Sequence, residues 1–225
     1  MYKHFIKRLC DIVLSGIAIV MLAVPMAIVA IAIKIDDPGP VLFKQRRIGK
    51  NKNGQVTYFE ILKFRSMKMS TPHDVPTHLL ENPEQYITKI GKFIRKTSID
   101  ELPQIYQVFT GKLSCIGPRP GLWNQVNLWE EREKYGANDV LPGITGWAQI
   151  NGRDELEIPV KAKLDGEYAA ALNAGILKGM AMDIKCLFGT VVAVLKSDGV
   201  VEGGTGQIKK EEQKKEELED ELLVK

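Results

Sequence analysis

A continuous apolar stretch near the start of the chain constrains its fold more than any other feature. The sequence VLSGIAIVMLAVPMAIVAIAI, Val13 to Ile33, has 21 residues and no charged side chain. A helix needs about 20 such residues to cross the hydrocarbon core of a bilayer. A cleaved signal peptide is not expected, because the stretch exceeds an ordinary signal core and no cysteine-paired secreted domain follows it. We therefore expect the segment to remain in the mature protein and to enter a membrane.

Two features favour a re-entrant hairpin over a single spanning helix, which remains the alternative. Pro25 lies near the middle of the stretch, where a proline removes a backbone hydrogen bond and kinks a helix. Each half, of about ten residues, covers roughly 15 Å, enough to enter one leaflet and return. Basic residues flank both ends, so the positive-inside rule places both ends on the cytoplasmic side. They are Lys3, Lys7 and Arg8 before the stretch, and Lys34, Lys44, Arg46 and Arg47 after it.

The composition of the chain excludes several kinds of chemistry. The three cysteines are far apart and odd in number, so neither a disulfide framework nor a zinc site is indicated. The three histidines have no metal-ligand spacing and suit no serine or cysteine triad. A net charge of +3 is small for a nucleic-acid-binding protein, so no nucleic acid is expected as a partner. Any catalysis is therefore expected to depend on carboxylates.

Local patterns behind the membrane segment predict a mixed domain. VLFKQRRIG and QVTYFEILKFRSM are short β-branched and aromatic runs, which predict a β-hairpin with Asn53-Gly54 at its turn. Apolar spacing predicts helices within residues 86–113, ending at Gly111, and within residues 123–136 and 176–196. The last helix has an apolar face with spaced lysines, which suits a membrane interface. Residues 71–83 are expected to form a mobile surface loop, or alternatively a lid over a site.

The expected fold class is α+β. A proline-broken re-entrant membrane helix hairpin over residues 1–36 precedes a mostly helical cytoplasmic domain, residues 37–206, on the membrane surface. This domain should contain a small β-hairpin or sheet and interfacial amphipathic helices. Residues 116–120 (IGPRP) and 141–153 (LPGITGWAQINGR) are rich in glycine and proline, so they are expected to be loops. The charged tail, residues 207–225, is expected to be solvated or disordered.

An adjacent pair of acids, Asp100 and Glu101, is the candidate catalytic feature. In SIDELPQ, either Ser98 or Asp100 could be the N-cap of a helix, with a capping box from Ser98 to Glu101. The helix dipole would then stabilise the ionised carboxylates of the first turn. An ionised carboxylate can act as a nucleophile or bind magnesium. The alternative is that the pair only caps a helix.

Five basic residues lie in turn-rich stretches around the acid pair. They are Lys63 and Arg65 in KFRSM, Arg95 in IRKTS, Arg119 in GPRP and Arg153 in NGR. Arginine side chains match phosphate oxygens two at a time, although any one of these residues could simply lie on a solvated surface. Together they indicate a diphosphate substrate, with its charge met by arginines and by a magnesium ion (Mg2+) on a carboxylate. With the membrane segment, this favours a lipid-linked phosphate as acceptor.

Four motifs, in this order behind the apolar stretch, resemble the bacterial sugar transferase family. They are KFRSM, IRKTSIDELPQ, GKLSCIGPRP and LPGITGWAQINGR, and the resemblance runs from about residue 2 to about residue 205. The family comprises polyprenyl-phosphate hexose-1-phosphate transferases, here in their small monotopic form. The resemblance implies transfer of a sugar-1-phosphate from a UDP-sugar to undecaprenyl phosphate, giving undecaprenyl-diphospho-sugar and UMP. It also implies that the protein acts at the cytoplasmic face of the bacterial inner membrane and that its reaction is the first membrane step of glycoconjugate synthesis.

The same resemblance implies roles for the candidate residues. Asp100 would attack the β-phosphate and form a covalent phospho-sugar intermediate, while Glu101, with Asp100, would hold Mg2+. Arg95 and Arg119 match positions that bind phosphate. Lys63, Arg65 and Arg153 match substrate contacts less closely. Like Arg95 and Arg119, they are expected to bind substrate.

The chain also departs from the family pattern. The membrane break is often Ser-Pro in the family but is Val24-Pro25 here. The stretch after NGR lacks the usual tryptophan, with Asp165 and Tyr168 as the matching pair, so the identity of the sugar is left open. A non-catalytic membrane scaffold is the alternative function, and it would tolerate loss of Asp100. A homodimer is left open.

Overall fold

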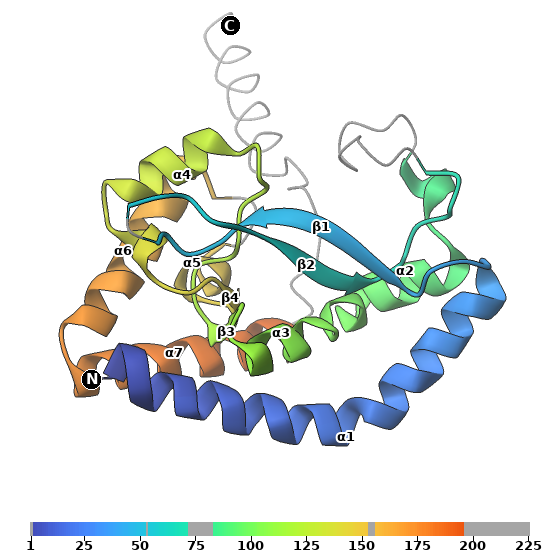
Figure 1. The fold of residues 1–225 in the computed structure, drawn as a ribbon, viewed down its shortest axis with the longest axis horizontal. Helices are drawn as coiled ribbons and strands as arrows, with labels where there is room; N and C mark the ends of the chain where they lie inside the picture. The colour runs from blue at the N-terminus through green and yellow to red at the C-terminus, as the bar shows by residue number, and fades with distance from the viewer. Residues whose placement is uncertain (1, 53, 72–82, 153–155, 196–225) are drawn as a thin grey trace, which may run out of the picture.

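The computed structural model describes residues 2–52, 54–71, 83–152 and 156–195, and Figure 1 shows how their elements are arranged. Asn53, residues 72–82 of the expected loop or lid, Arg153 and the charged tail lie outside the described residues. The division of the chain at residues 36 and 206 stays a prediction. The arrangement supports the α+β class, because helices predominate and the strands form two small sheets.

The apolar stretch forms one long helix. A short π-helical turn, η1 (Tyr2–Ile6), leads into α1 (Lys7–Asp36), which contains Pro25 and bends along its length (Figure 1). The expected helix-break-helix hairpin is not confirmed, since the helix runs through the proline without interruption. In the described part of the chain it is the one helix long and apolar enough to cross a membrane, with 11% of its most apolar window buried. Most of α1 therefore presents apolar side chains to its surroundings.

Both ends of α1 are fixed to the same folded body. Near its start, Arg8 donates hydrogen bonds to the carbonyls of Val108 and Phe109 at 2.6 and 2.7 Å. At its end, the Asp36 carboxylate accepts a hydrogen bond from the backbone N–H of Ile90 at 2.9 Å. Apolar packing joins the second half of α1 to the soluble elements; the buried residues of this cluster are Met26, Ile33, Phe64 and Ile94. The helix consequently lies against the domain at both ends.

The predicted hairpin is confirmed, and a second sheet was not foreseen. Strands β1 (Leu42–Ile48) and β2 (Tyr58–Phe64) pair antiparallel, with Leu42 opposite Phe64 and Ile48 opposite Tyr58. Strands β3 (Ser114–Ile116) and β4 (Gly143–Thr145) pair parallel, so parts of both regions expected as loops are regular. Their close approach requires glycine, because a Cβ on Gly143 would lie 2.1 Å from the backbone nitrogen of Gly117.

The stretch expected as helical over residues 86–113 contains two helices. These are α2 (Lys89–Lys96) and α3 (Gln104–Thr110), separated by the 3-10 turn η4 (Ile99–Glu101). Gly111 ends α3 as predicted, in the left-handed region with φ 84°. Two other predicted helices are confirmed, as α4 (Val126–Glu133) and α7 (Ile176–Leu195).

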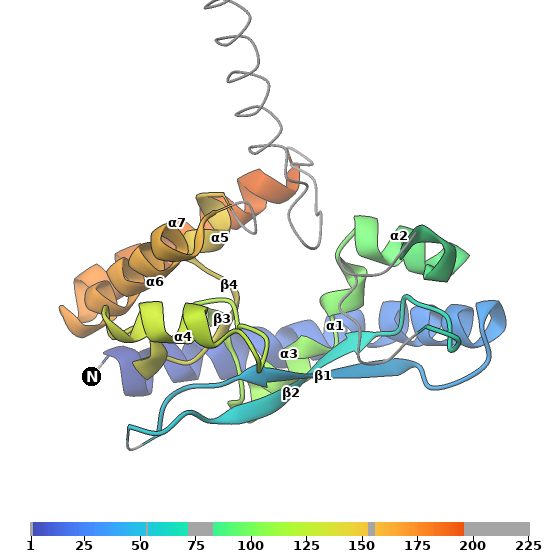
Figure 2. The same ribbon diagram turned by 90° about the horizontal axis from the view of Figure 1, so that it is seen from above.

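Four further helical elements complete the described residues. The short η3 (Pro83–Tyr86) and η5 (Ala137–Asp139) are 3-10 turns, and α5 (Trp147–Ile150) is a single helical turn. The long α6 (Ile158–Asn173) was not predicted. Figure 2 shows α4, α5, α6 and α7 grouped at one end of the molecule and α2 at the other, with the hairpin and α3 between them.

Candidate active site

The acid pair lies in the 3-10 turn η4, between α2 and α3. Ser98, immediately before it, has φ 55° and makes no side-chain capping hydrogen bond, and Asp100 lies inside the turn. Ser98 therefore stands at the N-cap position of η4 and both acids lie in its first turn, as expected for one of the two alternatives, but the Ser98 side chain does not make the expected capping hydrogen bond, and Asp100 is not an N-cap. Pro103 lacks a backbone N–H and suits the start of a helix, so the chain begins a new helix after the pair. A non-glycine residue in the left-handed region costs of order 1 kcal/mol or more, and such strain is typical of functional sites.

The two carboxylates of the pair have different surroundings. Glu101 Oε1 lies 2.8 Å from Arg119 Nη2 and 3.1 Å from Lys63 Nζ, and Arg119 Nη1 reaches Glu101 Oε2 at 3.4 Å. Asp100 is buried, and its Oδ2 lies 3.9 Å from Lys63 Nζ. Lys63 therefore bridges the two acids, whereas the Arg119 guanidinium forms a two-pronged contact with Glu101.

The electrostatics of Glu101 follow from these contacts. Burial alone would raise the pKa of the Glu101 carboxyl, but the positive charges of Arg119 and Lys63 outweigh it and hold the pKa well below its usual range. Glu101 is therefore ionised at neutral pH. A carboxylate of such low basicity, with both oxygens bound by cations, is a weak nucleophile.

The structure brings together four of the predicted residues, Lys63, Asp100, Glu101 and Arg119, and directs another elsewhere. The buried Arg65 guanidinium binds Asp37, through Oδ2 at 2.9 Å and through its carbonyl, so Arg65 fixes the end of α1 to the hairpin. Arg95 lies half-buried in the last turn of α2, where its carbonyl accepts a hydrogen bond from the Ser98 N–H at 3.1 Å. The predicted contacts of these basic residues with substrate stay predictions.

The acid pair supplies oxygen donors of the kind that magnesium prefers. Within the described ranges, no group of three or more His, Cys, Asp or Glu side chains could hold a metal. Magnesium commonly uses one or two protein carboxylates together with phosphate oxygens and waters. Asp100 and Glu101 match that donor set, with the remaining ligands left to a diphosphate.

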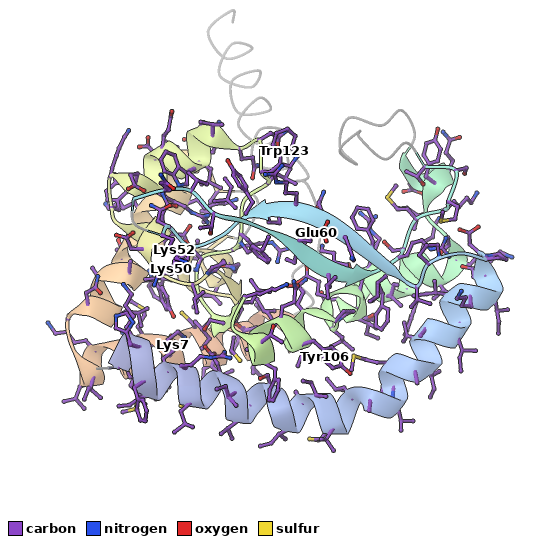
Figure 3. All side chains as sticks on the ribbon, in the orientation of Figure 1. Lys7, Lys50, Lys52, Glu60, Tyr106 and Trp123 are labelled. Atoms are coloured by element: carbon purple, nitrogen blue, oxygen red, sulfur yellow. The ribbon has the colours of Figure 1, made fainter. Side chains whose placement is uncertain are left out.

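A buried polar cluster was missed in the sequence. Asp183 Oδ2 accepts hydrogen bonds from the Tyr2 hydroxyl at 2.7 Å and from Lys7 at 2.9 Å, while Oδ1 accepts one from the Tyr168 hydroxyl at 2.7 Å. Lys7 lies at the start of α1, labelled in Figure 3. The only sequence signal is Asp183, a single acid in a helix whose other charged residues are lysines. The cluster joins α1 to α6 and α7.

Asp165 and Tyr168, the pair matched to the family pattern, are both 1% exposed. Tyr168 donates to the Ile116 carbonyl at 2.9 Å as well as to Asp183. Burial, with the nearby Asp183 carboxylate, raises the pKa of Tyr168 far above its usual range, so its hydroxyl stays protonated. Asp165 binds Arg132 of α4. In the structure both residues belong to the core.

Comparison with known proteins agrees with the geometry. Residues 2–197 match the family described as bacterial sugar transferase. The chain belongs to this family. The resemblance inferred from the four motifs is thereby confirmed, and all four motifs lie within the matched range.

Named relatives of this bacterial sugar transferase differ in length. It is 40% identical over 196 residues to the undecaprenyl-phosphate glucose phosphotransferase of Komagataeibacter xylinus, covering 82% of the chain and 35% of that protein. It is 37% identical over 196 residues to the UDP-glucose:undecaprenyl-phosphate glucose-1-phosphate transferase of Escherichia coli K12, covering 84% and 40%. It is 38% identical over 198 residues to the exopolysaccharide production protein PSS of Rhizobium leguminosarum bv. phaseoli, covering 84% and 95%. The chain thus spans less than half of the first two relatives and nearly all of the third.

Proposed function

We propose that this protein transfers a sugar-1-phosphate from a UDP-sugar to undecaprenyl phosphate and releases UMP. The observation that carries the proposal is the acid pair of buried Asp100 and partly buried Glu101, in which Arg119 and Lys63 bind Glu101 and leave the two carboxylates with different surroundings. The names of the first two relatives, which refer to undecaprenyl phosphate and glucose, support the acceptor and make UDP-glucose the first donor to test.

The two acids would have separate roles in this reaction. An Asp100 oxygen attacks the β-phosphorus of the UDP-sugar, the bond from that phosphorus to the bridging oxygen breaks, and UMP leaves with the electron pair. An oxygen of undecaprenyl phosphate then attacks the same phosphorus, and the Asp100 carboxylate is restored. Glu101 cannot replace Asp100, because its oxygens are bound by two cations and its pKa is lowered. Arg119 and Lys63 instead supply positive charge where the diphosphate binds.

Magnesium is part of the proposal. Asp100 and Glu101 would hold the ion together with oxygens of the diphosphate. When bound, it would neutralise charge on the leaving UMP. Lys63 stands beside both carboxylates, at 3.9 and 3.1 Å, and limits the negative charge that this site accumulates without the ion.

The placement of α1 favours a re-entrant membrane anchor on the cytoplasmic face of the inner membrane. A helix crossing the bilayer has its two ends on opposite sides of about 30 Å of hydrocarbon. Here the contacts of Arg8 and of Asp36 fix both ends to one body, and basic residues flank both ends. The exposed apolar side chains of α7, among them Leu177 and Phe188 at 77% and 66% exposure, suit a helix in the membrane interface.

A direct assay tests the proposed function. Purified protein in lipid nanodiscs receives undecaprenyl phosphate and a panel of UDP-sugars, and UMP release is measured. We expect release that requires both the lipid and one or a few of the sugars, and that is lost in Asp100→Asn. No release with any sugar, with correctly folded protein, would reject the proposal. Function in cells that survives Asp100→Asn would favour a scaffold instead.

A further inference from the structure

We infer that Asp165 and Arg132 are positioning residues for Arg119, so that a buried ion pair between α4 and α6 sets the geometry of the acid pair. The inference rests on the proposed function and adds to it residues outside the acid pair. Neither residue contacts Asp100 or Glu101 by any described hydrogen bond; they act through the loop that carries Arg119.

The loop around Arg119 is held by its carbonyl groups. It contains Pro118 and Pro120, which have no N–H to donate, so the loop depends on donors supplied by other elements. Four successive carbonyls each accept such a hydrogen bond: Pro118 from the Gly143 N–H at 2.9 Å, Arg119 from Arg132 at 2.9 Å, Pro120 from Arg47 at 3.2 Å and Gly121 from the Ile48 N–H at 3.0 Å. The second of these carbonyls, that of Arg119, is bound by the buried guanidinium of Arg132.

The geometry of the Arg132–Asp165 pair is directed toward this carbonyl. Arg132 is 6% exposed and Asp165 is 1% exposed. Arg132 Nε and Nη2 both donate to the same oxygen, Asp165 Oδ2, at 2.8 and 2.6 Å, and Nη2 also donates to the Arg119 carbonyl at 2.9 Å. Asp165 Oδ1 has no hydrogen-bond partner among the described residues. A pair that served stability alone would gain more from a fork with both carboxylate oxygens. The observed arrangement instead fixes Nη2 between Asp165 and Arg119.

The consequence reaches the acid pair through one residue. The Arg119 backbone is held by Arg132, and its guanidinium contacts Glu101 at 2.8 and 3.4 Å. A displacement of about 1 Å in such a group can reduce turnover by roughly a hundredfold. Loss of the Asp165 charge should therefore alter the active site although Asp165 belongs to a different helix.

The first test compares two variants of α6. Asp165→Asn keeps the shape and removes the charge that orients Arg132; Leu172→Ala is the matched control, because Leu172 is buried in the same helix and packs in the core cluster around Tyr168. We expect Asp165→Asn to lower kcat for UMP release by about ten- to a hundredfold. Leu172→Ala should lower Tm by at least as much as Asp165→Asn does. It should leave kcat and KM within about twofold of the wild-type values. Equal kinetic losses in both variants would reduce Asp165 to a stability role and overturn the inference.

A double-variant cycle asks whether the effect passes through Arg119. If Asp165 acts through Arg119, then Asp165→Asn should cost less than about threefold in kcat when Arg119→Ala is already present. If the two sites are independent, Asp165→Asn lowers kcat by the same factor in the wild type and in Arg119→Ala. That result would contradict the inference.

Hydrogen exchange separates this inference from the proposed function, because it needs no substrate. Asp165→Asn should accelerate amide exchange in a peptide covering residues 117–124, and Leu172→Ala should not. Unchanged exchange in Asp165→Asn overturns the positioning role even if the transferase reaction is confirmed. Faster exchange in Asp165→Asn, together with a wild type that releases no UMP from any sugar, would reject the proposed function and retain the coupling of Asp165 to the loop.

Discussion

Replacing Glu101 by glutamine should destabilise the protein by an amount that the structure allows to be worked out. Glu101 is the shared counter-ion of Lys63 and Arg119, whose side chains are 8% and 32% exposed. Removing one partner of a buried ion pair costs about 3–5 kcal/mol, because a charge is left uncompensated. Asp100 still lies 3.9 Å from Lys63, and Arg119 is partly solvated, so we expect the low end, about 3 kcal/mol. For a domain of this size that corresponds to a fall in Tm of roughly 6–12 °C.

Thermal unfolding in detergent provides the assay, and a second variant provides the control. Lys63→Met removes the buried cation, so the double variant Lys63→Met/Glu101→Gln should be more stable than the sum of the single losses predicts. A decrease in Tm of less than about 2 °C for Glu101→Gln would refute the reasoning. So would a loss of stability in the double variant equal to the sum of the two single losses.

The pH dependence of this loss has a definite sign. The pKa of Glu101 is depressed from an ordinary value of 4.5, so its ion pairs stabilise the fold above that value and are lost only as the pH falls through the folded-state pKa. The gap in Tm between wild type and Glu101→Gln should therefore be constant between about pH 8 and pH 5. A gap that changes within this range would contradict the lowered pKa of Glu101.

Three further predictions concern the cation, the topology and the α1 anchor. EDTA should abolish UMP release, and magnesium should restore it better than zinc does, since the ligands are hard oxygens; full activity in excess chelator would contradict this. A cysteine at the exposed position of His4 should resist an impermeant periplasmic reagent in intact cells and react after permeabilisation; labelling in intact cells would exclude the re-entrant placement. Asp183→Asn should lower the stability by about 3 kcal/mol or more, because it leaves Lys7 buried without its counter-ion; an unchanged Tm would show that the cluster contributes little.

Local sequence patterns predicted the parts of the fold whose contacts are local. The hairpin, α4, α7 and the glycine that ends α3 follow from turn residues and apolar spacing. The pairing of β3 with β4 joins three-residue strands distant in the sequence, which leaves no periodic signal. Helix α6 was missed because its apolar residues do not gather on one face. The helix is also rich in alanine and contains Gly166.

The sequence predicted those candidate site residues that lie within the motifs, but not the tertiary contacts of these residues. Asp100, Glu101, Lys63 and Arg119 lie in three of the four motifs, and the structure brings them together. The partner of Arg65 could not be foreseen, since Asp37 lies in another segment and the choice between a phosphate and a carboxylate depends on tertiary packing. The same holds for Asp165, whose partner Arg132 lies on a different helix.

The covalent role of Asp100 is the central claim, and intact-protein mass analysis tests it most directly. The protein is incubated with the UDP-sugar that supports UMP release, without undecaprenyl phosphate, and its mass is compared with that of Asp100→Asn treated in the same way. The account predicts a stoichiometric gain equal to one sugar-phosphate on the wild type, its loss when undecaprenyl phosphate is added, and no gain on Asp100→Asn. Turnover by Asp100→Asn near the wild-type rate, or an active wild type that never carries the sugar-phosphate, would contradict it.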